Sequence, residues 1–383
     1  MLKIYNHATI TDYALQMADK INLTQKGVLA LGATICCLVF ISWVFIHWNL
    51  DLKISSFFYD PHEGWYLKNR QPWKFLYQYG TIPGFLLTIS AFIGWASTFI
   101  NPRFSRWQRH LLLIFLTSAI GGGIIVNAIL KTYWGRPRPK QVTEFHGQFE
   151  YQHIVPPGIP GKGHSFTCGH CTMGFIFITL FAFRRKSKAL AYAGGLFGMG
   201  YGALISMGRI VQGAHFALDA IWSLGVILIV STTFYYFILK IPRAGPILSF
   251  NPTVRQKWLM AAGIGALVAV MGLFFLTKRP FYEHYEKPMG ITSGIKSINI
   301  LMNVEFQEKN LKFADIRDGK IIIDAQGFAF PNADQELRLK KIQKGDTLNI
   351  YGNIRSEGYF SELNHSITLI LPKSMKDKIH VQY

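Results

Sequence analysis

Six polar residues between positions 131 and 219 have side chains that could together carry out phosphoryl transfer. They are three permanent cations, two imidazoles and one carboxylate: Lys131, Arg138, His170, Arg209, His215 and Asp219. A phosphate ester needs fixed cations around its equatorial oxygens, a nucleophile opposite the leaving oxygen and an acid beside that oxygen. These residue types supply all three functions, so we expect an enzyme that acts on a phosphate ester.

The residue types also suggest a division of roles. The guanidinium of an arginine makes forked contacts to phosphate, so the three cations can form a phosphate clamp. A neutral imidazole can attack phosphorus when a carboxylate holds its other nitrogen. His215 and Asp219 are four residues apart and lie on one face of a helical turn. This pairing leaves His170 as the acid.

Each of these groups lies at the edge of a strongly apolar segment, where a charge is costly unless it has a function. The chain has 383 residues, of which 50% are hydrophobic and only 16% are charged. Soluble proteins carry about 25% charged residues. The deficit lies between residues 26 and 277, and the residues after 277 have an ordinary soluble composition. We therefore expect a membrane domain followed by a small soluble domain.

Seven apolar segments are candidate transmembrane helices, because a helix needs roughly 20 mostly apolar residues to cross a bilayer. They are residues 27–48, 81–100, 111–130, 168–183, 189–207, 217–239 and 258–277. The fourth and fifth are short and rich in small residues, so we expect them to pack inside the bundle.

Lysine and arginine accumulate in the N-terminal segment, residues 1–26, and in the loops after the second, fourth and sixth segments. Basic loops of this kind mark the cytoplasmic side of a membrane. We expect the N-terminus and the linker, residues 241–257, to be cytoplasmic. The loops that carry the six residues, and the C-terminal segment, would then lie outside, on the periplasmic side of a bacterial inner membrane.

The C-terminal segment, residues 291–383, has the pattern of a small β-rich domain. Short runs at 298–306, 320–330, 347–354 and 366–371 alternate with turn residues. A barrel or a sandwich fits this length, and the segment carries no group of catalytic residues.

The net charge of +19 raises the question of nucleic-acid binding. Nucleic-acid-binding proteins gather their basic residues in one patch or stripe, whereas here these residues lie in short turns between apolar segments. We therefore expect no nucleic-acid partner, and expect the lipid bilayer and a lipid phosphate to be the partners instead.

The spacing of the six residues resembles the three-part signature of the type-2 phosphatidic acid phosphatase superfamily, which also includes the vanadium haloperoxidases. The three parts are Lys131-TYWGRP-Arg138-Pro139, Thr167-Cys168-Gly169-His170 and Gly208-Arg209-IVQGA-His215-FAL-Asp219. The resemblance covers roughly residues 30 to 240, and both the spacings within the parts and the gaps between them fit.

The resemblance implies a phosphatase core of six helices in an all-α membrane fold. The apolar segment at residues 258–277 would add a seventh transmembrane helix. The lipid phosphatase domain would be residues 27–240. Hydrolysis would need no metal or other cofactor and would pass through a phosphohistidine, with His215 as nucleophile, Asp219 as its orienting partner and His170 as the acid. The phosphate would be bound by Lys131, Arg138, Arg209, Cys168 and Gly169. Substrates of this kind include phosphatidic acid, phosphatidylglycerol phosphate, undecaprenyl diphosphate and a lipid A phosphate. The oligomeric state stays open.

Two positions depart from the family pattern, because Cys168 and Gly208 stand where the family usually has serine. A thiol donates hydrogen bonds only weakly, so we expect a lowered rate or an altered choice of substrate. A phosphotransferase that passes the phosphoryl group to a second lipid, and a lipid-binding scaffold protein, are the alternative functions.

The tetrapeptide Cys168-Gly169-His170-Cys171 also matches a redox motif. A redox enzyme would need a thioredoxin-like βαβ unit around it, and a zinc site would need further ligands. The surrounding sequence offers neither. A Cys168–Cys171 disulfide that controls the phosphatase is a separate hypothesis.

Overall fold

In a computed structural model, the chain forms two compact units: a helical unit, Met1–Val268, and a β-sheet unit, Ala269–Tyr383. The structure describes residues 7–382 apart from 148, 161–162, 243–252, 257, 260, 264, 267–268, 270–278, 292–293, 303–305, 330–332, 358–359 and 377–378.

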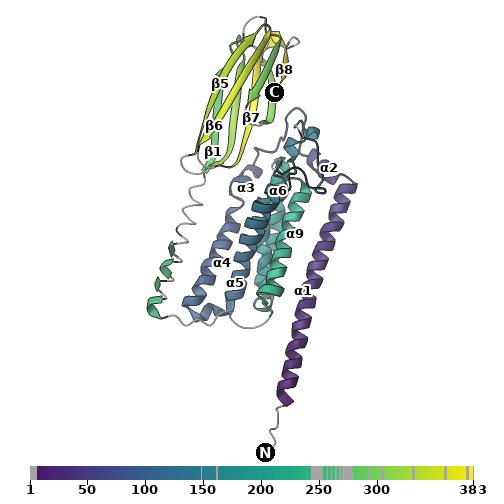
Figure 1. Ribbon diagram of the computed structural model, residues 1–383, viewed down its shortest axis with the longest axis vertical. Coiled ribbons are helices and arrows are strands. Elements are labelled where there is room, and N and C mark those ends of the chain that lie inside the picture. The colour runs from purple at the N-terminus through teal and green to yellow at the C-terminus, as the bar shows by residue number, and fades with distance from the viewer. Residues whose placement is uncertain are drawn as a thin grey trace, which may run out of the picture. The chain divides into compact units, whose positions relative to one another are not determined.

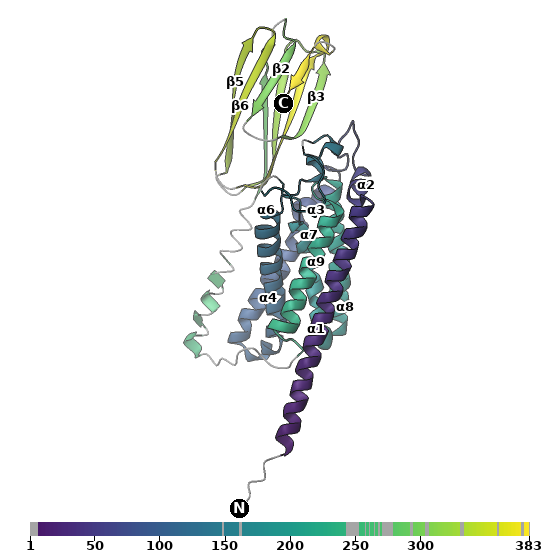
Figure 2. The same cartoon turned by 45° about the vertical axis from the view of Figure 1, so that its right-hand side comes forward.

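The helical unit is a bundle of long helices joined by shorter helical turns (Figure 1). Its principal elements are α1 (His7–His47), α2 (Leu50–Ser56), α3 (Trp73–Tyr79), α4 (Ile82–Ile100), α5 (Gln108–Leu116), η2 (Thr117–Leu130), α6 (Lys131–Tyr133), η3 (Pro139–Gln141), α7 (Gly169–Phe175), η5 (Ile176–Arg185), α8 (Lys188–Val211), α9 (Ala217–Thr233) and η6 (Phe234–Ile238). The first helix, α1, runs alongside α9 in both views of the ribbon (Figures 1 and 2).

Within the described residues, five continuous helices are long and apolar enough to cross a membrane. They are Asn22–His47, Trp73–Ile100, Phe104–Tyr133, Lys188–Val211 and Ala217–Ile238. Each contains most or all of one segment expected from the sequence. The second is longer than expected, because the helix begins at Trp73 and includes α3 as well as α4. The chain is therefore an integral membrane protein.

The segment expected at 168–183 has a different helical form. It consists of α7 followed by the 3₁₀ helix η5. A 3₁₀ helix rises about 2.0 Å per residue instead of about 1.5 Å, so Gly169–Arg185 reaches roughly 30 Å, the thickness of a bilayer core. Most of the segment expected at 258–277 lies outside the described residues.

Small residues allow α7 and α8 to approach closely, as expected for the fourth and fifth segments. However, α8 is not enclosed within the bundle as expected, because Leu196 and Tyr192 on its other face are exposed. A Cβ atom on Gly174 would lie 2.7 Å from the Cα of Gly202, and a Cβ on Gly202 would lie 2.1 Å from the ring of Phe175. Neither position has room for a side chain. Close contact between small residues is a common way to join helices inside a membrane.

The β-sheet unit has two four-stranded sheets. One has the strand order β1-β4-β7-β3 and the other β5-β6-β2-β8. Their bounds are β1 (Arg279–Pro288), β2 (Ser297–Met302), β3 (Phe306–Ala314), β4 (Lys320–Ala329), β5 (Asp334–Lys344), β6 (Thr347–Glu357), β7 (Phe360–Pro372) and β8 (His380–Gln382). Both sheets contribute to one buried core, with Ile323 and Leu369 from the first sheet and Ile298 and Ile350 from the second.

The expected strands lie largely within β2, β4, β6 and β7, whereas the sequence did not predict β1, β3, β5 or β8. Strand β1 begins at Arg279, before the expected start of this domain at residue 291. Strand β5 is an edge strand whose alternating outward residues include Glu336, Arg338 and Lys340. Charged residues on an edge strand discourage pairing with other chains. They also interrupt the apolar pattern, so a search for apolar runs does not detect this strand.

Candidate active site

Main-chain hydrogen bonds join the three motif segments. The N–H of Ser165 donates to the oxygen of Arg136 at 3.0 Å, and the N–H of Lys140 donates to the oxygen of Gly213 at 3.0 Å. The first bond connects the segments before α7 and after α6, and the second connects η3 with the turn before α9. Residues that are far apart in the sequence are therefore held in one region.

The residues proposed from the sequence all lie at the ends of helices. Lys131 begins α6, Arg138 precedes η3, Cys168 is the N-cap of α7, Gly169 and His170 open α7, Arg209 is in the last turn of α8, His215 precedes α9, and Asp219 is in its first turn. Arg138, Arg209, His215 and Asp219 are buried, whereas Lys131 and His170 are partly exposed.

His215 is held in one tautomer by a main-chain group. Its Nδ1 lies 2.7 Å from the main-chain oxygen of Ser165 and 3.9 Å from Oδ2 of Asp219. A carbonyl oxygen can only accept a hydrogen bond, so Nδ1 carries the proton and Nε2 keeps its lone pair. This Nε2 atom is buried and has no hydrogen-bond partner among the residues that the structure describes. An imidazole with a free Nε2 lone pair can act as a nucleophile.

Burial lowers the pKa of His215 to about 4. The nearby charges of Arg209 and Arg138 lower it further, while Asp219 opposes them. The structure thus brings both guanidinium groups close enough to influence this imidazole. At neutral pH, His215 is uncharged and able to attack phosphorus.

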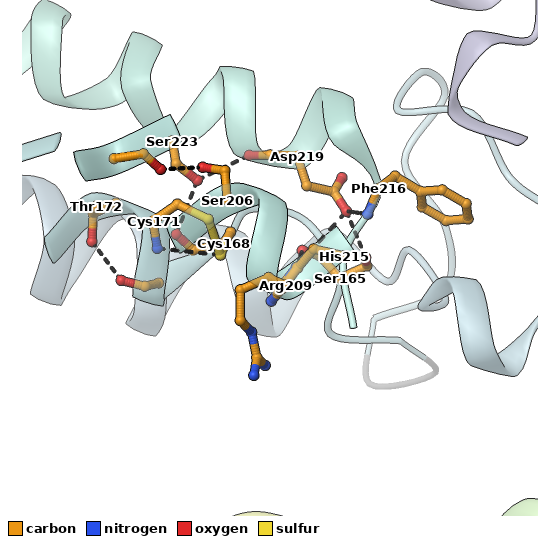
Figure 3. Close-up of a disulfide and its surroundings, with 12 residues drawn as sticks. Ser165, Cys168, Cys171, Thr172, Ser206, Arg209, His215, Phe216, Asp219 and Ser223 are labelled. Carbon is orange, nitrogen blue, oxygen red and sulfur yellow. Dashed lines mark hydrogen bonds and ion pairs between the residues drawn. A yellow bond between two sulfur atoms is a disulfide. The ribbon is translucent and has the colours of Figure 1, made fainter. Parts of the chain in front are cut away.

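The carboxylate of Asp219 accepts three further hydrogen bonds, two of which appear in Figure 3. Its Oδ2 accepts from the hydroxyl of Ser165 at 2.6 Å and from the N–H of Phe216 at 3.0 Å. Its Oδ1 accepts from Nη1 of Arg136 at 2.5 Å. Ser165 therefore contacts both His215 and Asp219, through its main chain and its side chain respectively.

The structure adds Arg136, which sequence reasoning missed although it lies inside the first motif. Its side chain is fully buried, and its Nη2 donates to Oδ2 of Asp51 at 2.7 Å. Its guanidinium carbon lies 4.4 Å from the centre of the Phe216 ring. Asp51 is in the first turn of α2 and accepts the N–H of Leu218 on Oδ1 at 3.0 Å. Asp51 lies just after the first apolar segment of the chain. The other six residues were identified partly because each lies at the edge of an apolar segment, and the same signal could have identified Asp51.

Tyr77 of α3 connects two of the expected residues. The guanidinium carbon of Arg209 lies 4.7 Å from the centre of the Tyr77 ring, and the imidazole of His170 stacks on the same ring with 5.8 Å between centres. Arg209 also donates from Nη1 to Gln212 at 3.1 Å. The structure thus brings His170, the expected acid, close to Arg209, one of the cations expected to bind phosphate.

Cys168 forms a disulfide with Cys171, and both residues are buried (Figure 3). The Sγ atom of Cys168 also accepts the N–H of Cys171 at 3.3 Å. A disulfide sulfur has no hydrogen to donate, so Cys168 in this form cannot replace the hydroxyl of the usual serine. The neighbouring Thr167 is fully buried, and its hydroxyl lacks a hydrogen-bond partner within the described part of the chain. Control of activity by the disulfide stays a prediction.

Comparison with known proteins identifies the family of the chain. Residues 111–243, which include every residue proposed above for catalysis or phosphate binding, match the PAP2 superfamily. The chain is also 30% identical over 222 residues to a protein described as lipid A 4'-phosphatase from Francisella tularensis subsp. novicida (strain U112). That match covers 55% of this chain and 95% of the relative. No solved structure matches the chain.

Proposed function

Because this chain belongs to the PAP2 superfamily and is a membrane lipid phosphatase, we propose that it hydrolyses its substrate through a phosphohistidine on His215. The observation that carries the proposal is the arrangement of this imidazole. Nδ1 is tied to a main-chain oxygen, and the buried Nε2 has no partner among the described residues. Buried polar groups are normally satisfied, so an unused Nε2 in a site with several cations is best explained by a reaction partner.

In the first step, the lone pair of Nε2 forms a bond to phosphorus. The bond between phosphorus and the lipid oxygen breaks, and its electron pair leaves with that oxygen. His170 begins protonated and gives its proton to the leaving oxygen. The phosphoryl group is then on His215, whose ring carries a positive charge near the carboxylate of Asp219.

In the second step, a water molecule attacks phosphorus and gives a proton to the now neutral His170. The bond between phosphorus and Nε2 breaks, and its electron pair returns to the imidazole. Inorganic phosphate leaves, and both histidines regain their starting forms. No step requires a metal ion, so we propose that hydrolysis is metal-independent.

In this proposal, Arg138, Arg209 and Lys131 bind the phosphate, and the main-chain N–H of Gly169 assists them. Both arginines are buried, and their charges reach His215. Fixed cations that need no rearrangement stabilise the charge that develops on the phosphoryl oxygens. The partly exposed Lys131 at the start of α6 is suited to the outer side of the phosphate.

We propose a phosphorylated membrane lipid as the substrate, with the 4'-phosphate of lipid A as the first compound to test. The similarity to a lipid A 4'-phosphatase over 95% of that protein supports this choice. The proposed setting is a bacterial inner membrane, with the site loops and the β-rich domain, residues 291–383, on the periplasmic side. In that arrangement, residues 27–240 form the six-helix core, residues 258–277 cross the membrane once more, and the β-rich domain is a sandwich.

The test measures phosphate release from purified lipid phosphates by the detergent-solubilised protein. We expect release from at least one lipid phosphate, unchanged by a metal chelator, and no release by a His215→Ala variant. His62→Ala is the matched control, because His62 is an exposed histidine outside the three motifs. Full activity of His215→Ala contradicts the mechanism. Transfer of labelled phosphate to a second lipid instead of to water indicates a phosphotransferase.

A further inference from the structure

A buried chain of charges extends from the expected site to α2. Arg136 lies between two carboxylates, with Nη1 on Asp219 and Nη2 on Asp51. Asp51 and Arg136 are 85 residues apart in the sequence. All three side chains are at most 2% exposed, so water screens their interactions only weakly.

Both carboxylates have the hydrogen bonds of ionised groups. Asp51 accepts from Arg136 on one oxygen and from the N–H of Leu218 on the other, and a charged carboxylate acts only as an acceptor. Burial raises the pKa of Asp51, and the charge of Arg136 opposes this effect. The hydroxyl of Tyr151 lies 3.4 Å from Nη2 of Arg136 and 3.4 Å from Nδ1 of His153. Burial raises the pKa of Tyr151, so this phenol adds no charge.

The balance of these charges affects His215. Arg136 alone would cancel the charge of Asp219, which is the nearest carboxylate to the imidazole of His215. Asp51 restores one negative charge to the group. The positive charges of Arg209 and Arg138 work against this group, because they disfavour a cationic imidazole at His215. The net negative charge of the Asp51–Arg136–Asp219 group therefore favours an intermediate with a positive ring.

We propose that Asp51 is a positioning residue for phosphoryl transfer, which acts through Arg136 and Asp219 to stabilise the phosphorylated form of His215. This inference rests on the proposed function of His215. Asp51 touches neither substrate nor His215 in this scheme. Its effect lies in the negative charge that it returns to the group.

A purely structural role must be separated from this one, because breaking a buried ion pair can destabilise the whole protein. Rapid-quench measurement of a single turnover makes the separation. The amplitude of phosphoenzyme formation reports how many molecules are folded and active, whereas the rate constant reports how fast each active molecule reacts. A structural defect lowers the amplitude alone, and a charge defect lowers the rate constant.

The test compares Asp51→Asn with wild type in the full-length protein, using a radiolabelled lipid phosphate that the wild type hydrolyses. We expect the rate constant of phosphoenzyme formation and kcat to fall by about 10- to 100-fold, as for other groups that support a catalytic ligand, with KM unchanged. Asp60→Asn is the matched control, because its partly exposed carboxylate accepts the nearby main-chain N–H groups of His62 and Glu63. An unchanged rate constant in Asp51→Asn overturns the proposal.

Asp51→Glu decides the case if Asp51→Asn does not fold. This variant keeps the negative charge, so we expect it to retain a rate constant close to that of wild type. A folded Asp51→Glu enzyme whose rate constant falls by about 100-fold contradicts the proposal. His215→Ala is measured in the same experiment. If it remains active, the proposed function fails; if it is inactive while Asp51→Asn reacts like wild type, only the role of Asp51 fails.

Discussion

His215 donates its Nδ1–H to the main-chain oxygen of Ser165 at 2.7 Å, whereas Oδ2 of Asp219 lies 3.9 Å from the same nitrogen. The tautomer of the imidazole is therefore set by a group that no side-chain substitution removes. The Asp219 carboxylate acts mainly through its charge and through the bond that it accepts from the hydroxyl of Ser165. Orientation and charge stabilisation are thus divided between two groups.

This division predicts different effects for two variants. Asp219→Asn removes the charge near His215 and leaves Arg136 without one of its two carboxylates, so we expect kcat to fall by at least about 100-fold. Ser165→Ala keeps the main-chain oxygen and loses only the hydroxyl, so we expect a loss of about 10-fold or less. Steady-state kinetics on the two purified variants checks the order. Equal losses would show that the hydroxyl and the charge are equally important.

The second prediction concerns pH. The pKa of His215 is lowered to about 4, first by burial and then by the charges of Arg209 and Arg138. The free enzyme should therefore keep an uncharged nucleophile well below pH 6.5, and the part of kcat/KM that depends on His215 should decline only as the pH approaches about 4. The phosphate group of the substrate also ionises in this pH range. Its pKa is therefore measured by phosphorus NMR, and the plot of kcat/KM against pH is corrected for it.

The same pKa affects stability with a definite sign. Between pH 6.5 and about 4, the unfolded chain binds a proton at His215 that the folded protein does not bind. The contribution of this residue is complete above pH 6.5 and is lost as the pH falls through that window. We expect the unfolding midpoint of His215→Ala to change less with pH over this window than the midpoint of wild type. An equal dependence on pH in both proteins would argue against a neutral buried imidazole.

A third prediction assigns a function to the hydroxyl of Thr167. This buried group has no hydrogen-bond partner among the described residues, and Cys168 cannot donate while it is in the disulfide. We expect the Thr167 hydroxyl to bind the substrate phosphate in place of the missing serine. Thr167→Val keeps the shape and should raise KM about 5- to 10-fold, the value of one lost hydrogen bond. A more stable variant with unchanged KM would identify the hydroxyl as an unused group.

A fourth prediction compares two glycines in the third motif. Gly213 has a φ of +63°, and a Cβ there would lie 2.2 Å from the ring of Trp65. Gly213→Ala should lower the unfolding midpoint and the activity together, because the left-handed conformation alone costs about 1–2 kcal/mol for alanine. A Cβ on Gly208 would lie 3.7 Å from Trp73 and Leu76, which is ordinary contact. Gly208→Ala is therefore the control and should fold normally.

Much of the membrane unit can be predicted from the sequence, because the length of an apolar helix is a local property. The five continuous helices follow from apolar runs alone. The 3₁₀ form of η5 could not be predicted in this way, because an apolar run does not distinguish a 3₁₀ helix from an α-helix. In the β-sheet unit, β5 was missed because its outward charges interrupt the apolar pattern.

The site shows a similar limit. The spacing of Lys131, Arg138, His170, Arg209, His215 and Asp219 indicates phosphoryl transfer. The supporting residues have no such signal. Asp51 meets Arg136 across 85 residues, Ser165 orients His215 with a main-chain atom that every residue has, and Tyr77 is one of 17 tyrosines. Only the folded chain identifies these partners.

The most direct test of the mechanism is to find the phosphorylated residue. A radiolabelled lipid phosphate is mixed rapidly with excess protein, the reaction is stopped in alkali, and the labelled peptide is mapped. We predict that the label appears on His215 before inorganic phosphate is released, and that it is absent from His215→Ala. Label on another residue, or a complete turnover without any labelled protein, would contradict the account.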